Sequence, residues 1–366
     1  MSKFFSAKLL LIILSFAASL HLFSATQVYA SQWSDSLKKL GTGTKGVSIA
    51  ATVMNKNSGQ LLIDLSGQTA AQPASILKLF TVATALDRLG IDFKTTTEAR
   101  AYELPDSQGV LQGDLFIYGK GDPGLTSYGN SNSLSALADK LVASGLKRVT
   151  GNIVGDRTYF RSQLVPPGRT EADLNQSYGA QVSSLSVDQN IASLMVKPGN
   201  KLSDMAIIEI GPTSNLAVIN NRVFTGKKGS KVKMAISRAK NQNLIEISGS
   251  IPLNSPTKYY SVTMHDPALW AAAIMKDILL SKGVSIDGQY SSIGHKSIIQ
   301  TFAPLPLQQK IVEVESRGLL NWIEQINKNS NNLYAEILLR HLGVNSLNQI
   351  DVQFSDLQGI EEIKNY

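Results

Sequence analysis

The sequence predicts a mixed α+β fold, because strand patterns and helical patterns are grouped along the chain rather than regularly alternating. A hairpin pattern comes first and a helical pattern follows it. Short strands with glycine, asparagine and serine turns fill the middle, and helical patterns return after about residue 306. The chain has 366 residues, of which 43% are hydrophobic and 17% are charged. The length is enough to bury two or more domain cores, and the composition is too apolar for a disordered chain.

The amino-terminal segment has the layout of a secretory signal peptide. Two lysines precede an apolar run from Leu9 to Leu22, and Val28-Tyr29-Ala30 places small residues before a cleavage point. We therefore expect residues 1–30 to be removed and a mature chain to begin at Ser31, exported to the periplasm or cell envelope. An uncleaved membrane anchor is the alternative, although the run is short for a span. No later stretch is apolar and long enough to cross a membrane.

Composition excludes several classes of chemistry. The chain has no cysteine, so disulfides, thiolate nucleophiles and cysteine-ligated zinc are excluded. Its four histidines lack the spacing of a helical metal site and its acidic residues are scattered. We expect no metal and no organic cofactor. The net charge of +7 is modest and no recognition motif accompanies it, so no nucleic-acid partner is expected.

The first elements are a hairpin and a helix. Residues Val47–Met54 have a strand pattern, and Leu61–Leu65 is expected to pair with it across a turn that contains Gly59. After Pro73, apolar residues at helical spacing predict a helix from about Ser75 to Leu89.

Short strands are expected between about Thr95 and Ser292, with helices at Leu134–Ser144 and Pro267–Lys282. Four lysines gather around two glycines in what is expected to be a hairpin tip: Lys227, Lys228, Lys231 and Lys233. A solvated turn is the simpler interpretation, and attraction to an anionic envelope polymer is the alternative. Two further helices are expected at Leu319–Lys328 and Leu333–Leu342, separated by a polar loop.

The segment Pro73-Ala74-Ser75-Ile76-Leu77-Lys78 carries the most chemical information. Residues three apart on a helix lie on the same face, so the Lys78 amine can reach the Ser75 hydroxyl. A serine hydroxyl becomes a good nucleophile when an adjacent base accepts its proton. On these residues alone, a serine capping a helix beside a solvated lysine is an equally good interpretation.

A second candidate pair lies in the polar loop between the last two predicted helices. In an extended loop, residues two apart point the same way, so Ser330 and Asn332 can face one cleft. A serine can pass on a proton, and an asparagine offers one donor and one acceptor to a substrate amide. Taken alone, the segment is also consistent with an ordinary polar connection between helices.

Taken together, these segments resemble the class C low-molecular-mass penicillin-binding proteins, the D-alanyl-D-alanine carboxypeptidase/endopeptidase family. The run Ser330-Asn331-Asn332-Leu333-Tyr334-Ala335-Glu336 resembles the S-x-N block of that family, and the segment around Ser75 and Lys78 resembles its S-x-x-K block. Intervening blocks follow in order, and the resemblance spans about Val47 to Tyr366. They are Gly119–Pro123, Gly151–Asp156, Tyr178-Gly179-Ala180 and Asp266-Pro267-Ala268. The two motifs are 255 positions apart, far more than in class A β-lactamases.

The resemblance implies a domain arrangement. Residues 31–95 and 293–366 would form a DD-peptidase/β-lactamase-like catalytic domain, with helices on an antiparallel sheet, and residues 96–292 would be mostly β domains inserted into it. The family carries a third motif, K-T-G or a close variant, on an edge strand, and no Lys-Thr-Gly occurs in this sequence. We therefore expect a chain that is truncated at its carboxyl end and lacks the last strands of the catalytic sheet.

The resemblance also implies a mechanism. Ser75 would attack the bond between two terminal D-alanines of a peptidoglycan stem peptide, with Lys78 as the base. Ser330 would return a proton to the leaving D-alanine, and Asn332 would position the substrate. β-Lactams would acylate the same serine. Because removing one oxyanion donor typically costs about 10²–10³ in rate, a catalytically inactive homologue or a peptidoglycan-binding module is the alternative.

One further residue is carried over from the family. Asp173 aligns with an acidic position of the inserted region. By resemblance it could bind the free amine of the diamino acid in the stem peptide. A surface aspartate or a helix cap is the competing interpretation.

Overall fold

The computed structural model describes residues 33, 35–39, 49–213, 215–294, 308–346 and 354–366. The expected signal peptide lies outside these residues. The chain divides into two compact units, Met1–Ala74 and Ser75–Tyr366, and each is described by itself. Within the described ranges, no helix has both the length and the apolar character needed to cross a bilayer. The mixed α+β class predicted from the sequence is confirmed.

The first unit contains the predicted hairpin. Strands β1 (Ala51–Met54) and β2 (Leu61–Leu65) pair in antiparallel fashion, with a register shift between Val53 and Met54. Gly59 in the connecting turn has a φ of +69°, a left-handed conformation that glycine adopts without steric cost.

Four helices of the second unit pack together around one buried cluster. They are α2 (Lys78–Arg88), α6 (Leu319–Asn329), α7 (Asn332–Ser346) and α8 (Ser355–Asn365). Val82 of α2, Trp322 of α6 and Leu338 of α7 are buried in this cluster. The burial of these apolar faces fixes α2 against α6 and α7, which are the three helices that carry the candidate motifs.

Helix α7 is also attached to the loop that follows β5. The buried ring of His341 lies 2.7 Å from the carbonyl oxygen of Gly121. Burial lowers the pKa of His341 to about 4, so the ring is neutral at pH 7 and its Nε2–H donates to this carbonyl. Gly121 has a φ of +81°, and a Cβ there would lie 2.6 Å from the histidine Nε2. Glycine at this position therefore permits the contact that anchors α7.

A five-stranded sheet forms the centre of the second unit, in the order β15-β7-β5-β3-β16. The strands are β3 (Thr96–Ala101), β5 (Leu115–Gly119), β7 (Ile153–Asp156), β15 (Tyr290–Ile293) and β16 (Gln309–Glu315). A small sheet in the order β14-β6-β4 lies at one end of it. Its strands are β4 (Val110–Leu111), β6 (Arg148–Val149) and β14 (Ser285–Ile286).

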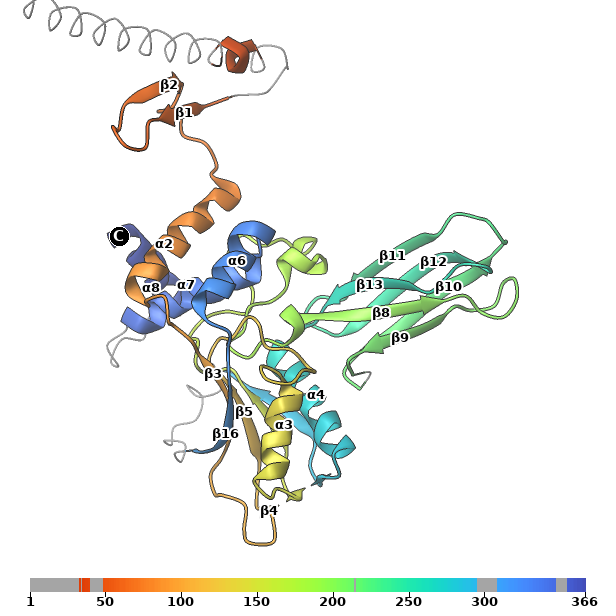
Figure 1. Ribbon diagram of the computed structural model, residues 1–366. Helices are drawn as coiled ribbons and strands as arrows, with labels where there is room; N and C mark the ends of the chain where they lie inside the picture. Colours follow the sequence, from red (N-terminus) through yellow and green to blue (C-terminus); the bar gives the residue numbers. More distant parts are fainter. Residues whose placement is uncertain (1–32, 34, 40–48, 214, 295–307, 347–353) are drawn as a thin grey trace, which may run out of the picture. The chain divides into compact units, whose positions relative to one another are not determined.

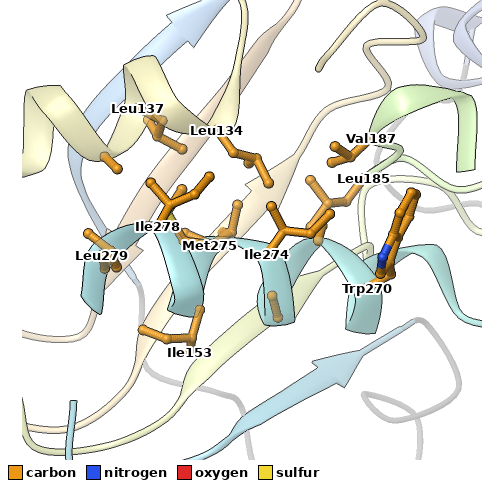
Figure 2. Packing of buried hydrophobic residues seen from close by; sticks show 14 of the residues in the cluster. Leu134, Leu137, Ile153, Leu185, Val187, Trp270, Ile274, Met275, Ile278 and Leu279 are labelled. Atoms are coloured by element: carbon orange, nitrogen blue, oxygen red, sulfur yellow. The ribbon is translucent and has the colours of Figure 1, made fainter. Parts of the chain in front are cut away.

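Two helices cover the central sheet, α3 (Leu134–Ala143) and α4 (Pro267–Ser281). Trp270, Ile274 and Ile278 follow one another at intervals of four residues and are buried on one face of α4. Figure 2 shows Ile274 and Ile278 packed toward Leu134 and Leu137 of α3, and Trp270 beside Leu185 and Val187. The predicted helices at 134–144 and 267–282 are therefore confirmed to within one residue.

The remaining strands form what we call the β module, residues 191–263 (Figure 1). One three-stranded sheet has the order β13-β8-β9 and the other has the order β10-β12-β11. Val196, Val223 and Ile247 are buried between the two sheets. The strands are β8 (Ile191–Lys197), β9 (Ile207–Gly211), β10 (Val218–Gly226), β11 (Lys233–Arg238), β12 (Leu244–Pro252) and β13 (Lys258–Thr263).

The expected hairpin around Gly226 and Gly229 is wrong. β10 and β11 do not pair with each other, because β12 lies between them. β10 is parallel to β12 and β11 is antiparallel to it. The lysine-rich segment 227–232 therefore crosses the end of β12 instead of closing a hairpin.

The expected domain boundaries stay a prediction. β16, from the second predicted catalytic segment, pairs in antiparallel fashion with β3, which begins the predicted insertion. The chain therefore returns to the central sheet before it forms α6 and α7.

Candidate active site

Ser75 lies in a single 3₁₀ turn, η1 (Ala74–Leu77), that leads directly into α2. The predicted helix thus begins three residues later than expected, at Lys78. The N-cap of α2 is Leu77 and no side chain caps it, so the interpretation of Ser75 as a capping residue is wrong. The turn places the Lys78 amine over the serine hydroxyl, with 3.2 Å between Lys78 Nζ and Ser75 Oγ.

Ser330 and Asn332 occupy the junction between α6 and α7. Ser330 ends α6 in the left-handed conformation, with a φ of +52°. A residue other than glycine in this conformation costs roughly 1–2 kcal/mol. Hydrogen bonds from Lys78 Nζ to the Ser330 carbonyl oxygen (2.8 Å) and to Ser330 Oγ (3.1 Å) offset that cost. Asn332 then begins α7, and its Oδ1 lies 2.6 Å from Lys78 Nζ.

All four predicted catalytic residues therefore meet at the Lys78 amine, although 255 positions separate Ser75 from Ser330. The Ser330 hydroxyl also donates to Ser75 Oγ at 2.9 Å. The two shortest contacts of the amine, to Asn332 Oδ1 and to the Ser330 carbonyl, are with groups that only accept. A neutral amine can satisfy both with its two N–H groups and still direct its lone pair toward the hydroxyls.

The surroundings of Lys78 favour this neutral form. Burial lowers the pKa of Lys78, and the positive charge of Arg169 lowers it further, whereas the negative charge of Glu336 acts in the opposite direction. Glu336 is itself largely buried, and burial raises the pKa of its carboxyl group. The neutral carboxyl, which a raised pKa favours, does not oppose the neutral form of Lys78.

Asn332 connects this cluster to the segment that carries Asp173. Its Nδ2 donates to the carbonyl oxygen of Tyr178 at 3.1 Å, which fixes the orientation of the amide. Tyr178 lies in the 3₁₀ turn η3 (Ser177–Gly179), next to η2 (Asp173–Asn175). Its hydroxyl donates to Asp173 Oδ1 at 2.9 Å. A Cβ on Gly179 would lie 1.9 Å from the Asp173 carbonyl oxygen, so glycine allows the two turns to pack closely.

Asp173 is partly exposed beside the cluster and is joined to it through Tyr178. Its Oδ2 accepts hydrogen bonds from the backbone nitrogen (2.8 Å) and the hydroxyl (2.7 Å) of Thr170. Hydrogen bonds from Thr170, with a further one from Tyr178, hold the pKa of this carboxyl below its usual range. It therefore presents a fixed negative charge at the edge of the cluster.

Arg169 and Tyr178 contribute to the cluster although no local sequence pattern indicates a role for them. The guanidinium of Arg169 lies 5.9 Å from the centre of the Tyr178 ring, and its charge acts on Lys78. Tyr178 was part of a block of residues shared with the family, which was the available signal, but spacing alone did not reveal its contact with Asn332. In the part of the chain that the structure describes, no three His, Asp or Glu side chains are placed to hold a metal ion.

Comparison with known proteins identifies a family and relatives that are similar to this chain. The family model of the D-Ala-D-Ala carboxypeptidase 3 (S13) family matches residues 36–364. A D-alanyl-D-alanine carboxypeptidase of Actinomadura sp. (strain R39) is 30% identical over 305 residues, which are 82% of this chain and 54% of that protein. The D-alanyl-D-alanine carboxypeptidase DacB of Haemophilus influenzae is 22% identical over 314 residues, 85% of this chain and 62% of that protein. The chain thus spans a little over half the length of these relatives.

A solved structure has the same fold. The crystal structure of penicillin-binding protein 4 from Haemophilus influenzae matches with a TM-score of 0.73 at 21% identity, over 90% of this chain and 69% of that one. A second crystal structure of that protein, in complex with a β-lactam, matches with a TM-score of 0.67. The predicted fold class is therefore confirmed. With a family match over nearly the whole described chain, the protein belongs to the D-Ala-D-Ala carboxypeptidase 3 (S13) family.

Proposed function

We propose that this chain is a serine-type D-Ala-D-Ala carboxypeptidase/endopeptidase that acts on peptidoglycan stem peptides through an acyl-enzyme on Ser75. The observation that carries the proposal is the Lys78 amine, which lies within hydrogen-bond distance of Ser75 Oγ, Ser330 Oγ and Asn332 Oδ1. The names of the relatives and the family match point to the same activity.

In the first half of the reaction, Ser75 Oγ attacks the carbonyl carbon between the two terminal D-alanines. The Lys78 amine accepts the hydroxyl proton as the new C–O bond forms. The C–N bond then breaks and D-alanine leaves, with its amine receiving the proton of the Lys78 ammonium through Ser330, which restores the neutral amine. Ser330 suits this role because its hydroxyl lies 3.1 Å from the Lys78 amine and 2.9 Å from Ser75 Oγ.

In the second half, water attacks the ester carbonyl and Ser75 leaves as a hydroxyl. Lys78 again accepts the proton from the nucleophile and returns it to the leaving oxygen. Asn332 positions the amide of the substrate. The substrate must therefore displace or share the hydrogen bonds that the Asn332 side chain now makes with Lys78 and Tyr178. β-Lactams acylate the same serine, and the reaction involves no metal or organic cofactor.

Asp173 is proposed to bind the free amine of the diamino acid in the stem peptide. Its depressed pKa and its partial exposure beside Tyr178 suit recognition of an ammonium group. Turnover of amine-bearing and amine-blocked peptides by Asp173→Lys tests this role. We expect Asp173→Lys to lose turnover of the amine-bearing peptide only. Unchanged turnover of both peptides would refute the assignment.

An exported location, in the periplasm or cell envelope, is part of the same proposal, because the substrate is found there. A catalytically inactive homologue or peptidoglycan-binding module is the alternative, since this sequence contains no Lys-Thr-Gly.

Labelling with a fluorescent penicillin distinguishes the two functions. The wild-type chain is expected to become covalently labelled and to release D-alanine from a pentapeptide. Ser75→Ala should abolish both signals, whereas Ser107→Ala, at an exposed loop serine, should keep them. A well-folded wild-type chain that neither labels nor turns over would support the non-catalytic alternative.

A further inference from the structure

Three loops of the β module meet at one end. β10 and β12 run parallel from Val218–Leu244 to Gly226–Pro252, and β11 begins opposite the end of β12, at Ser250. In the other sheet, Lys258 at the start of β13 faces Val196 near the end of β8, and β9 begins opposite Lys197. Loops 198–206, 227–232 and 253–257 therefore lie together. We call this region, with the strand residues that flank it, the lysine end (Figure 1, right).

Backbone contacts fix these loops to one another and to the strands. Thr225, in β10, both donates to the Asp204 carbonyl oxygen (2.8 Å) and accepts from the Ser203 nitrogen (2.9 Å). The nitrogen of Gly229 donates to Asn254 Oδ1 at 3.0 Å, and the nitrogen of Leu253 donates to the Gly226 carbonyl oxygen at 3.0 Å. The lysine end is therefore a fixed platform.

The lysine end carries nearly all of the net charge of the chain. Segment 226–233 contributes four lysines, and segments 197–207 and 252–259 contribute Lys197, Lys201 and Lys258. Asp204 is the only acidic residue in the three segments, so their net charge is +6, against +7 for the whole chain. Among the described residues, these lysines form no ion pair with a carboxylate. The positive charge is thus available to an external partner.

Each of the three loops also exposes at least one apolar side chain near a lysine of the lysine end. Leu202 is 51% exposed, Val232 is 36% exposed and Leu253 is 37% exposed. Tyr259, which follows Lys258, is 68% exposed. A soluble polyanion would be attracted by the lysines but would gain little from these apolar groups. A lipid surface uses both, because basic residues meet anionic headgroups while apolar and tyrosine side chains enter the interface.

We propose that the lysine end docks the protein peripherally on an anionic lipid bilayer. The lysines would contact the headgroups, and Leu202, Val232 and Leu253 would enter the headgroup region. The attraction is electrostatic and reversible, since lysine is a flexible point charge without a fixed bidentate geometry. Docking at this end would hold the chain at a membrane surface without a spanning segment.

The absence of cysteine allows a site-specific test in the full chain. A cysteine replaces Leu202 and carries an environment-sensitive fluorophore. The matched control places the same label at Leu104, which is 53% exposed in the loop after β3. Vesicles of phosphatidylglycerol and phosphatidylcholine are titrated into both proteins, with pure phosphatidylcholine as the neutral reference. Emission at position 202 is expected to rise and shift to the blue on anionic vesicles only, while emission at position 104 stays constant.

Lysine neutralisation tests the electrostatic part. Because each basic residue near an anionic surface contributes about a fivefold factor in binding, Lys228→Gln/Lys231→Gln should weaken the partitioning seen at position 202 by about 30-fold. Lys140→Gln/Lys147→Gln removes the same charge from exposed positions of the second unit outside the β module, and should change the partitioning by less than about twofold. Thermal unfolding of each variant checks that the fold is kept.

Three results would overturn the proposal. They are no spectral change at position 202, an equal change at position 104, or equal weakening by both double substitutions. Binding of inorganic polyphosphate that depends on Lys228 and Lys231, with no response to vesicles, would identify a soluble polyanion as the partner instead of a membrane.

Discussion

The replacement Asn332→Asp tests the proposed role of the neutral Lys78 amine. The substitution keeps the shape of the side chain and places a carboxylate oxygen where Oδ1 now lies, 2.6 Å from Lys78 Nζ. Two unit charges at this separation attract by about 1.6 kcal/mol at the dielectric constant of water, and by about 6 kcal/mol at an effective value of 20. The charged ammonium is favoured by this amount, so the neutral fraction at pH 7 should fall by at least about tenfold.

The assay is the second-order rate constant for acylation by a fluorescent penicillin between pH 6 and 10. Asn332→Ala is the matched control, because it also removes the contact with Tyr178 but adds no charge. At pH 7 the aspartate variant should react at least about tenfold more slowly than the alanine variant, with the difference shrinking as pH rises. ¹³C NMR of the methylated Lys78 amine should show a raised pKa. Equal rates for the two variants at pH 7, or a difference that is the same at every pH, would refute the reasoning.

Three further predictions concern the framework of the site. Gly179→Ala should separate η2 from η3 and reduce labelling, because its Cβ would lie 1.9 Å from a backbone oxygen, whereas Gly318→Ala, with open space around it, should not. Ile278→Ala should lower the free energy of urea unfolding by about 2–5 kcal/mol, and Leu280→Ala, at a position that is 46% exposed, by much less. Burial raises the pKa of Asp122 from 3.8 to about 6, so its carboxyl destabilises the fold increasingly as pH rises between these values. The free energy of unfolding of Asp122→Asn should therefore match that of the wild type near pH 4 and exceed it by up to about 3 kcal/mol above pH 6. Parallel pH profiles would contradict this assignment.

Local patterns in the sequence were sufficient for most helices, and they marked Ser75, Lys78, Ser330 and Asn332 as candidates whose roles came from the family resemblance. The spacing of Ser75 and Lys78 follows from local geometry, and the polar loop at Ser330 lies between two strongly periodic helices. Both signals are short-range, so a single sequence carries them. Their convergence was expected only from the family resemblance, because no local sequence pattern predicts that α7 packs against α2.

Long-range pairing accounts for what the sequence analysis missed. The insertion of β12 between β10 and β11 depends on side-chain packing across two sheets, and the local turn residues at Gly226 and Gly229 suggested a hairpin instead. The contact between the Asn332 side chain and the Tyr178 carbonyl spans 154 positions. Because every residue has a backbone carbonyl, the residue type at position 178 does not indicate this contact. The same holds for His341 and Gly121, which anchor α7 through a backbone oxygen.

The most direct test of the account is to locate the covalent bond to a β-lactam. The full chain is incubated with benzylpenicillin, quenched, digested and mapped by mass spectrometry. We predict one penicilloyl adduct, on Ser75 in the tryptic peptide Asn57–Lys78, and its loss in Lys78→Met although Ser75 is unchanged. An adduct on another residue, or an undiminished adduct without the Lys78 amine, would contradict it.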